Sequence, residues 1–258
     1  MPSSFAPSAK QSEMAPTTII GTTLLENNRN NVYEGSITIN GKLYSGIVFD
    51  TGSSTVIVPA SCCVHCRKKT LFNITYDDGT FFRYYYCPAS VSLGGYSILN
   101  YPVGVCINTT KGSSCSTDNG VFGMAWPIVD FNHTIPFVTA LYRDGVIPAN
   151  MFSIYLSSIA DDDEISVSDD SSELMIGGMD PGRYTGSISW ITLVFQDFWT
   201  IGFSSLSVEG IPTPVYSSTS EFAAVDSGTS GITAPPLAFN AIISGIRRTG
   251  VKLSYEQM

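Results

Sequence analysis

The sequence has little positive charge. Its 258 residues include 13 Lys and Arg against 22 Asp and Glu, which gives a net charge of −9 and a pI of about 4.5. The only basic triplet is Arg67-Lys68-Lys69. Nucleic-acid-binding proteins carry a basic patch or stripe, so the composition speaks against a nucleic-acid partner. Because an acidic chain loses its self-repulsion as the pH falls, this composition also suits an acidic compartment.

Long apolar runs are also missing. No stretch approaches the ~18 consecutive apolar residues of a membrane span, and we expect none in this chain. The segment from Met1 to Thr18 lacks the apolar core of a secretory leader as well. Two explanations remain: a leader is missing from this sequence, or the protein is not secreted. We favour the first.

Histidine is scarce, and this limits the possible hydrolytic mechanisms. Only His65 and His133 could act as a base, and neither lies near a nucleophile-elbow pattern of the form G-x-S-x-G. Serine and cysteine hydrolase mechanisms therefore lack partners. Phosphate-binding glycine loops and dinucleotide fingerprints are absent too, so we expect no cofactor.

The residues that are abundant predict a mainly β protein. Only 14% of residues are charged and 43% are hydrophobic, with many Ser, Thr and aromatic residues, a composition typical of strands. Short alternating runs recur between turn signals, and Asn40-Gly41 predicts a hairpin turn within residues 36–50. Helical periodicity is confined to residues 137–146 and 235–250. The length suits one large or two modest domains.

Six cysteines, all in the first half, indicate an oxidising environment. The disulfide candidates are Cys62, Cys63, Cys66, Cys87, Cys106 and Cys115. Sequence alone does not choose the pairing, although Cys106 and Cys115 could close a small loop. A zinc site that uses His65 is the alternative for the C-C-V-H-C cluster, and we favour disulfides over a metal. Glycosylation is predicted on three sequons, at Asn73, Asn108 and Asn132.

One short phrase occurs twice. F-D-T-G-S-S at residues 49–54 returns as V-D-S-G-T-S at residues 225–230. Each Asp, Asp50 and Asp226, follows an apolar residue and begins a turn of small residues. The simpler interpretation is two unrelated strand-end turns, but the repeat is too close for chance.

Two such turns that face each other would form an acid–base site. Like charges held close together cannot both stay ionised, so their proton affinities split. One carboxylate could then take a proton from water while the other, protonated, polarises a carbonyl. The two apparent pKa values would belong to the pair.

The neighbouring residues fit this chemistry. Gly52 and Gly228 let the backbone approach the carboxylates closely. The remaining turn residues offer hydroxyl groups that could hold the carboxylates by hydrogen bonds; they are Thr51, Ser53, Ser227 and Thr229.

The repeated phrases resemble the two active-site loops of the pepsin-like aspartic peptidases, the eukaryotic two-lobe aspartyl proteases. Family members also carry a β-hairpin flap with a Tyr, which N-I-T-Y-D-D-G-T at residues 73–80 matches, and an apolar-apolar-Gly phrase beside the first Asp loop, which Val121-Phe122-Gly123 matches. Further similarity lies at residues 151–157, 174–193 and 198–203. The resemblance covers roughly residues 17–245.

The resemblance implies a bilobal fold with two β-rich lobes around a central cleft, and a peptide substrate bound in extended form. It implies that Asp50 and Asp226 are catalytic. Substrate contact is implied for Tyr76, Gly79, Thr80, Gly52, Gly228 and Thr229. Support of the site is implied for Thr51, Ser53, Ser227, Val121, Phe122 and Gly123.

Four segments are expected along the chain. Residues 1–16 read as a disordered tail and residues 17–157 as an N-terminal lobe. Residues 158–173 read as an acidic surface loop without the spacing of a calcium-binding EF-hand, and residues 174–258 as part of a C-terminal lobe.

Two departures from the family pattern stand out. Ile57 occupies a position where many family members have a Trp that bonds to the flap Tyr. The spacing of Val121 from Asp50, repeated from Asp226, would place the second apolar-apolar-Gly phrase beyond Met258. We expect a fragment or an incomplete gene model. There are two alternatives: a short inactive form, or a chain that assembles with strands from another chain.

The sequence therefore predicts an aspartic endopeptidase that cleaves peptides or proteins at acidic pH, works as a monomer when complete, and resides outside the cell or in an acidic secretory or lysosome-like lumen. The alternative is a catalytically inactive binding or inhibitor protein on the same scaffold. The two intact Asp loops favour the enzyme.

Overall fold

The computed structural model describes residues 21–28, 30–63, 66, 70–76, 79–109, 120–129, 134–158 and 172–253. Several predictions fall outside this range: the tail at residues 1–16, most of the acidic loop, the basic triplet, His65, His133, Cys115 and Asn132.

Strands dominate the described residues, as the composition predicts. They are β1 (Gly21–Asn28), β2 (Val32–Ile39), β3 (Lys42–Asp50), β4 (Val56–Val58), β5 (Phe72–Thr75), β6 (Phe81–Leu93), β7 (Tyr96–Thr109), β8 (Gly120–Gly123), β9 (Phe152–Tyr155), β10 (Ser172–Ile176), β11 (Thr200–Leu206) and β12 (Tyr216–Ala224). The helices are α1 (Phe137–Arg143) and α2 (Pro236–Arg248), and short 3₁₀ turns are η1 (Ala60–Cys63), η2 (Pro127–Val129) and η3 (Pro181–Arg183). Both helices lie where the periodicity predicts them.

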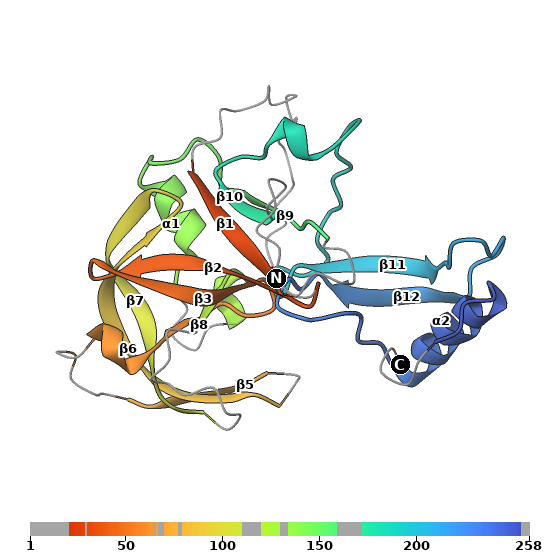
Figure 1. Cartoon of the computed structure of the whole chain (residues 1–258), viewed down its shortest axis with the longest axis horizontal. Coiled ribbons are helices and arrows are strands. Elements are labelled where there is room, and N and C mark those ends of the chain that lie inside the picture. The colour runs from red at the N-terminus through yellow and green to blue at the C-terminus, as the bar shows by residue number, and fades with distance from the viewer. Residues whose placement is uncertain are drawn as a thin grey trace, which may run out of the picture.

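Ten strands form one large sheet in the order β5-β6-β7-β4-β8-β3-β2-β1-β10-β9. An additional pairing of β2 with β6 folds this sheet back on itself, as the curved left half of Figure 1 shows. Most pairs are antiparallel, but β3 pairs with β8 and β4 with β7 in parallel. The parallel pair β3–β8 matters most for the site, because β3 ends at Asp50.

The predicted hairpin is present. β2 and β3 pair antiparallel, and Ile39 lies opposite Lys42. Asn40 and Gly41 both have positive φ, 51° and 82°, the conformation that the tightest hairpin turns require and that Asn and Gly adopt most readily. The turn therefore fixes the register of β3 and the point at which Asp50 leaves the sheet.

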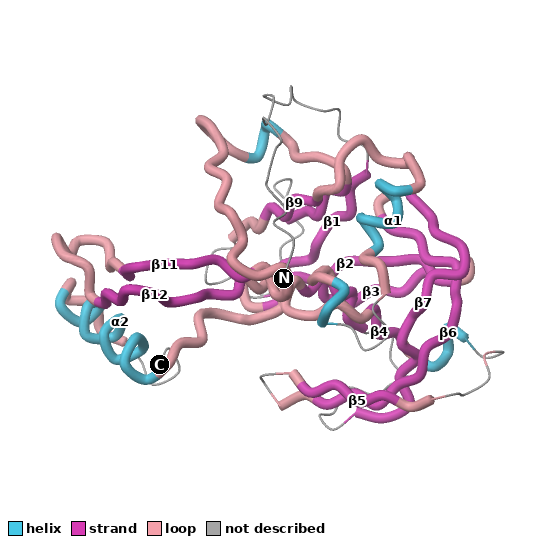
Figure 2. The backbone as a smooth tube through the Cα atoms, turned by 180° about the vertical axis from the view of Figure 1, so that it is seen from behind, coloured by secondary structure: helices cyan, strands magenta, loops and turns pink. Residues whose placement is uncertain are grey.

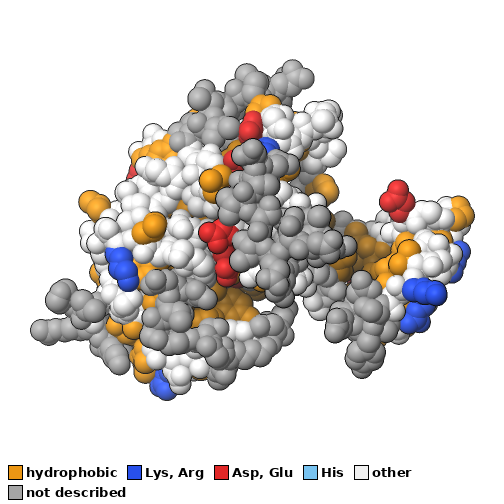
Figure 3. Space-filling view, viewed as in Figure 1, with side chains coloured by type: hydrophobic (Ala, Val, Ile, Leu, Met, Phe, Trp, Pro, Cys, Tyr) orange, Lys and Arg blue, Asp and Glu red, His pale blue; other side chains and the backbone are white. Residues whose placement is uncertain are grey.

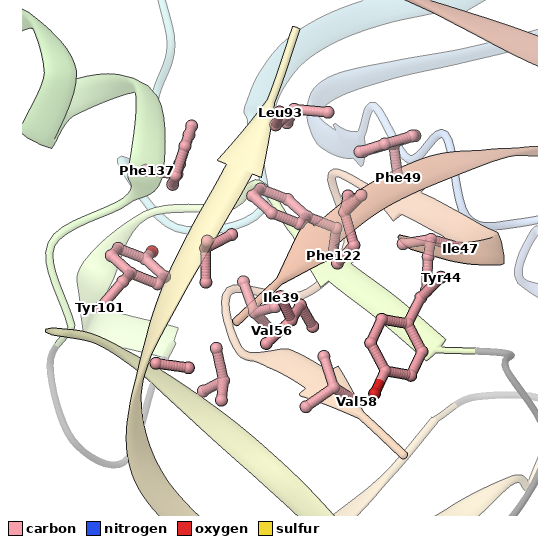
Figure 4. Packing of buried hydrophobic residues seen from close by; sticks show 14 of the residues in the cluster. Ile39, Tyr44, Ile47, Phe49, Val56, Val58, Leu93, Tyr101, Phe122 and Phe137 are labelled. Atoms are coloured by element: carbon pink, nitrogen blue, oxygen red, sulfur yellow. The ribbon is translucent and has the colours of Figure 1, made fainter. Parts of the chain in front are cut away.

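A row of aromatic rings fills the core inside the folded sheet. Phe49 of β3 packs on Phe122 of β8, with ring centroids 5.6 Å apart, and Phe122 packs edge-on against Phe137 of α1 at 5.6 Å. Tyr101 of β7 continues the row, as Figure 4 shows. The strand that carries Asp50 is thus anchored from behind by packed, fully buried rings, which hold the loop after it in one position.

The C-terminal part of the chain is smaller. β11 and β12 form a two-stranded antiparallel sheet that projects from the large sheet, and α2 lies at its far end (Figures 1 and 2). Apolar side chains gather on the β11–β12 hairpin in the view of Figure 3. Phe195 and Phe222 contact each other there at 5.3 Å, yet each remains about half exposed.

One strand crosses the boundary predicted between residues 173 and 174. β10 pairs with β1 and β9 inside the large sheet, so this sheet continues to Ile176. The reason is a long-range pairing: Gly21 of the first described strand lies opposite Ile176, which a reading of local composition does not reveal.

Candidate active site

Asp50 is the last residue of β3, and its carboxylate is held by its own turn. The side chain is only 4% exposed. Its Oδ1 accepts a 2.8 Å hydrogen bond from the Gly52 N–H, and its Oδ2 accepts a hydrogen bond from the Ser53 hydroxyl. The small residues of the turn therefore place two donors on one buried carboxylate, which fixes its orientation.

Asp226 repeats this arrangement after β12. Its Oδ1 accepts a 2.8 Å bond from the Gly228 N–H, and its Oδ2 accepts a 2.6 Å bond from the Thr229 hydroxyl. Thr229 thus has the same local contact as Ser53. Asp226 is half-buried and more open to solvent than Asp50.

The two loops are joined through Thr51 and Ser227. The Thr51 hydroxyl accepts a 2.8 Å bond from the Ser227 N–H and donates a 2.8 Å bond to the Val225 carbonyl. The Ser227 hydroxyl accepts a 3.1 Å bond from the Thr51 N–H and donates a 2.6 Å bond to the Phe49 carbonyl. Each loop therefore gives the other the same contacts, and the sequence repeat becomes a structural symmetry.

The glycines of each turn face the carboxylate of the other turn. A Cβ atom added to Gly52 would lie 2.6 Å from the Asp226 Cγ, and one added to Gly228 would lie 2.7 Å from the Asp50 Cγ. Real Cβ atoms do not approach other atoms so closely. The two carboxylates can face each other only because both positions lack a side chain.

Burial raises the pKa of the Asp50 carboxyl to about 6. The charge and hydrogen bonding of Asp226 add to this rise, while the bonds from Ser53 and Gly52 oppose it. Asp50 therefore holds a proton more readily than an ordinary carboxylic acid.

The Val121-Phe122-Gly123 motif of β8, with the two residues after it, supports the Asp50 loop. Asp50 pairs with Gly123 across the parallel ladder, the Met124 N–H donates a 2.8 Å bond to the Asp50 carbonyl, and Ala125 does the same to Ser53. A Cβ at Gly123 would lie 2.7 Å from the Ser54 Cα, so only glycine fits. Val121 and Phe122 of β8 pair with Val48 and Phe49 of β3, the strand that ends at Asp50. Among the described residues, the Asp226 loop has no comparable flanking strand.

Tyr76 lies in the connection between the paired strands β5 and β6, the hairpin that the sequence predicts to be a flap. Its N–H donates to the Thr80 carbonyl at 2.8 Å, and its carbonyl accepts from the Gly79 N–H at 2.9 Å. Its hydroxyl oxygen is buried, and burial followed by the charge of Asp50 raises the pKa of Tyr76, while Ser53 acts in the opposite direction. Tyr76 thus lies close enough to Asp50 to be affected by its charge.

Ile57 takes part in apolar packing beneath this hairpin. It is 1% exposed and belongs to a cluster with Tyr84 and Cys106, against which Phe72, Ile74, Phe82 and Tyr86 of the hairpin strands pack. The Tyr76 ring makes an edge contact with Phe82 at 5.9 Å. Apolar contacts of Ile57 therefore hold the hairpin in position. Many family members are expected to use a Trp at this position, which forms a hydrogen bond with the Tyr of the hairpin.

Trp199 supports the site as well, although the sequence did not single it out. Its indole N–H donates a 3.1 Å bond to the Met124 carbonyl, next to Gly123, and its ring contacts Trp126 at 5.5 Å and Phe152 at 5.3 Å. The backbone N–H of Trp126 donates a 3.0 Å bond to the Asp197 carbonyl. These contacts connect the support of the Asp50 loop to the start of β11. The only sequence signal was an aromatic residue directly before a strand.

The cysteines differ in part from the expectation. Cys66 and Cys87 form a disulfide, and Cys106 is disulfide-bonded as well, while its expected partner Cys115 lies outside the described range. Cys62 and Cys63 are free thiols, which corrects their prediction as disulfide partners. The reason is spatial: Cys66 is taken by Cys87 on β6, and the two free thiols face each other instead.

The remaining expectations concern a metal site, a membrane span and glycosylation. The described part of the chain holds no group of three or more His, Cys, Asp or Glu residues arranged to bind a metal ion, and none of its helices is long and apolar enough to cross a membrane. Asn73 on β5 and Asn108 on β7 are exposed, and their glycosylation stays a prediction.

Sequence comparison places the chain in a family. The family model described as eukaryotic aspartyl protease matches residues 32–256. Pepsin A of Sus scrofa is 31% identical over 248 residues, which cover 88% of this chain and 61% of pepsin A. Cathepsin D of Gallus gallus is 29% identical over 208 residues, covering 73% of this chain and 50% of that protein. The chain belongs to the eukaryotic aspartyl protease family, and it spans about three fifths of the length of pepsin A.

Structural comparison agrees. The crystal structure of the aspartic proteinase from Irpex lacteus matches with a TM-score of 0.72 at 22% sequence identity, covering 91% of this chain and 69% of that one. The likeness shows the fold, and the predicted mainly β, pepsin-like bilobal fold is confirmed.

Proposed function

We propose that this chain acts as an aspartic endopeptidase, with Asp50 and Asp226 as its catalytic dyad. The observation that carries the proposal is the reciprocal bonding of Thr51 and Ser227, which brings two carboxylates from distant parts of the chain against each other. A pair of unrelated strand-end turns would have no reason to bond in both directions. Membership in a protease family supports the same reaction class.

The proposed reaction is general acid–base hydrolysis. The pair takes up a proton as the pH falls through about 6, and the raised pKa of Asp50 favours that carboxyl as its holder. The protonated carboxyl donates a hydrogen bond to the carbonyl oxygen of the peptide, while the other carboxylate takes a proton from a water molecule. The resulting hydroxide adds to the carbonyl carbon. Proton transfer to the leaving nitrogen then breaks the C–N bond and restores the pair.

The other proposed roles follow from position. Tyr76, Gly79 and Thr80 lie at the end of a hairpin that reaches toward Asp50, so they would cover the peptide. Gly79 has a φ of 79°, and no atom beyond its chain neighbours lies within 4 Å of where a Cβ would be. Gly52, Gly228 and Thr229 border the carboxylates and would lie against the substrate backbone. Thr51, Ser53, Ser227, Val121, Phe122 and Gly123 would hold the loops.

An acidic working environment fits these groups. A dyad that must keep one proton works only where that proton is retained, and the raised pKa of Asp50 places this condition below about pH 6. The net charge of −9, the disulfides and the two exposed sequon asparagines suit a secreted or lumenal protein in an acidic compartment.

A cleavage assay tests the function. Denatured protein substrate is incubated between about pH 3 and 6 with the wild-type chain, Asp50→Asn and Asp144→Asn, which alters an aspartate at the end of α1 instead. We expect peptide products from the wild type and Asp144→Asn, and a loss of at least a hundredfold in Asp50→Asn, because general acid–base groups contribute about 10²–10⁴ in rate. Equal activity in all three proteins would contradict the dyad. No activity in a folded wild type would favour the inactive binding protein.

A further inference from the structure

A pair of free thiols lies away from the dyad, in the 3₁₀ turn η1. Cys62 and Cys63 are both buried, with exposures of 8% and 5%, and both belong to the core of the large sheet. Their Sγ atoms are 2.6 Å apart. That is closer than the ~2.9 Å between nitrogen and oxygen in an ordinary hydrogen bond, although sulfur is the larger atom.

The surrounding backbone holds the two sulfurs in this position. The Cys62 N–H donates a 3.1 Å bond to the Pro59 carbonyl, and the Cys63 carbonyl accepts a 3.0 Å bond from the Cys66 N–H. From the β2–β3 turn, the Asn40 side-chain amide donates a 3.1 Å bond to the Cys62 carbonyl and lies 3.9 Å from the Cys63 Sγ. The turn is thus fixed before, within and after the pair, so the sulfurs have little freedom to separate.

The two thiols differ chemically. A hydrogen bond from the Cys62 thiol lowers the pKa of Cys63, although burial opposes this shift. The same hydrogen bond, together with burial, raises the pKa of Cys62. Because the thiolate is the reactive form of cysteine, Cys63 is the better nucleophile and Cys62 is its proton-bearing partner. This is the division of roles that thiol–disulfide exchange requires.

We propose that Cys62 and Cys63 form a redox-active dithiol that closes to a disulfide between adjacent residues when it meets a small disulfide such as oxidised glutathione. The Cys63 thiolate attacks one sulfur of the reagent, forms a mixed disulfide and expels one glutathione thiolate. The Cys62 thiol then gives its proton to the expelled thiolate, attacks the Cys63 Sγ and expels the second glutathione as a thiolate, which takes a proton from the solvent. Two protein thiols are oxidised, and one disulfide reagent is reduced to two thiols.

Because Cys62 and Cys63 are adjacent in the chain, a disulfide between them suits a redox switch better than a structural role. A disulfide stabilises a fold chiefly by closing a loop of the unfolded chain, and the effect grows with loop length. The loop between adjacent residues is the shortest there is, so this bond would add little stability. The Cys66–Cys87 bond, whose partners are 21 positions apart along the chain, already braces the region. Ala60 and Ser61 at the start of η1 are exposed, so a small local opening would admit the reagent.

The test measures thiols and mass on the wild-type chain. Protein is equilibrated with a range of reduced to oxidised glutathione ratios, and is then denatured, alkylated without reduction and weighed by mass spectrometry. We expect the alkylated thiols to fall by two in a single step, with a loss of two hydrogens and no bound glutathione. Peptide mapping should place the new bond between Cys62 and Cys63, with Cys66–Cys87 intact.

Two variants test the order of attack. Cys62→Ser keeps the attacking thiol and removes the resolving one, so it should retain one bound glutathione. Cys63→Ser should take up glutathione at least tenfold more slowly. The proposal is overturned if the wild type keeps both thiols at a ratio that loads Cys62→Ser, if it retains glutathione, or if exchange moves the bond to Cys66 or Cys87. The wild-type result decides even where a variant fails to fold, and it is independent of peptidase activity.

Discussion

Thr51 and Ser227 bond to each other in both directions. Each hydroxyl accepts a hydrogen bond from the other residue's N–H, and each donates to a carbonyl just before the other loop's Asp. Two segments far apart along the chain therefore behave as one unit, and movement of either loop breaks bonds in both. This arrangement is what turns a repeated phrase into a candidate catalytic pair.

Removing one hydroxyl should loosen both loops. In Thr51→Ala we expect the free energy of unfolding to fall by about 2 kcal/mol, because two hydrogen bonds worth about 1 kcal/mol each are lost. We expect peptidase activity to fall on the order of a hundredfold, since a displacement of about 1 Å at a catalytic group has that effect. Urea unfolding and cleavage rates measure the two quantities.

Thr51→Ser is the matched control, because it keeps the hydroxyl and should stay near the wild type in both measurements. The double variant Thr51→Ala/Ser227→Ala should lose less stability than the two single losses added together, by at least about 0.5 kcal/mol, as residues in contact do. Strict additivity would show that the two loops are not coupled.

Alanine at Gly52 should affect the site more than the fold. Its Cβ would press on the Asp226 carboxylate, a side chain at the surface of the loop, so we expect activity to fall at least tenfold with only a small change in thermal stability. Gly123→Ala is the contrast, because its Cβ would meet the Ser54 and Thr55 backbone. We expect that variant to lose several kcal/mol of stability. Similar melting temperatures for the two variants would be evidence against these contacts.

Stability should depend on pH through Asp50. Its pKa in the folded chain is about 6, against an ordinary value of 3.8, so the folded state binds its proton more tightly than the unfolded state does. This stabilisation is fully present below pH 3.8 and is lost as the pH rises through 6, and it amounts to about 3 kcal/mol.

Asp50→Asn should remove this dependence, because the amide does not titrate. Urea unfolding at about pH 4 and pH 7 should therefore show the wild type losing stability relative to Asp50→Asn as the pH rises. The opposite trend would mean that Asp50 is stabilised as a carboxylate, and that its hydrogen bonds outweigh its burial.

A Trp placed at position 57 should not improve the proposed flap. Ile57 is 1% exposed and closely packed, so the larger ring of Ile57→Trp would overfill the cluster and cost about 1–3 kcal/mol. Ile57→Val should cost about 0.5–1.5 kcal/mol through a small cavity. Thermal unfolding of both variants is the measurement. A more stable, more active Ile57→Trp would show that the space for the Trp is present.

Much of this architecture could be predicted from local signals. Asn40-Gly41 predicts its hairpin because few other residues adopt two consecutive positive φ angles. The apolar spacing of α1 and α2 is clear, and the paired Asp phrases are unusual enough to identify the two loops. In each case the structure is decided by residues a few positions apart.

Long-range contacts could not be predicted, because they join residues that lie far apart in the sequence. The pairing of β10 with β1, the bond from Trp199 to Met124 and the bridging of Cys66 to Cys87 join residues whose proximity no local pattern encodes. The exposure of Asp50 and Asp226 could not be ranked from sequence either, since both follow apolar residues in almost identical turns. Burial by β8 makes the difference, and that depends on the tertiary fold.

The most direct test of the dyad is the titration of the two carboxyl groups. Protein with ¹³C-labelled Asp side chains is followed by NMR from about pH 3 to 8, in the wild type and in Asp226→Asn, with Asp50→Asn used to assign the signals. We predict that Asp50 titrates near pH 6 and that the Asp226→Asn substitution lowers this midpoint, because the neighbouring charge is gone while burial remains. A midpoint of Asp50 near the ordinary value of 3.8, unchanged in Asp226→Asn, would show that the two carboxylates do not act as a pair.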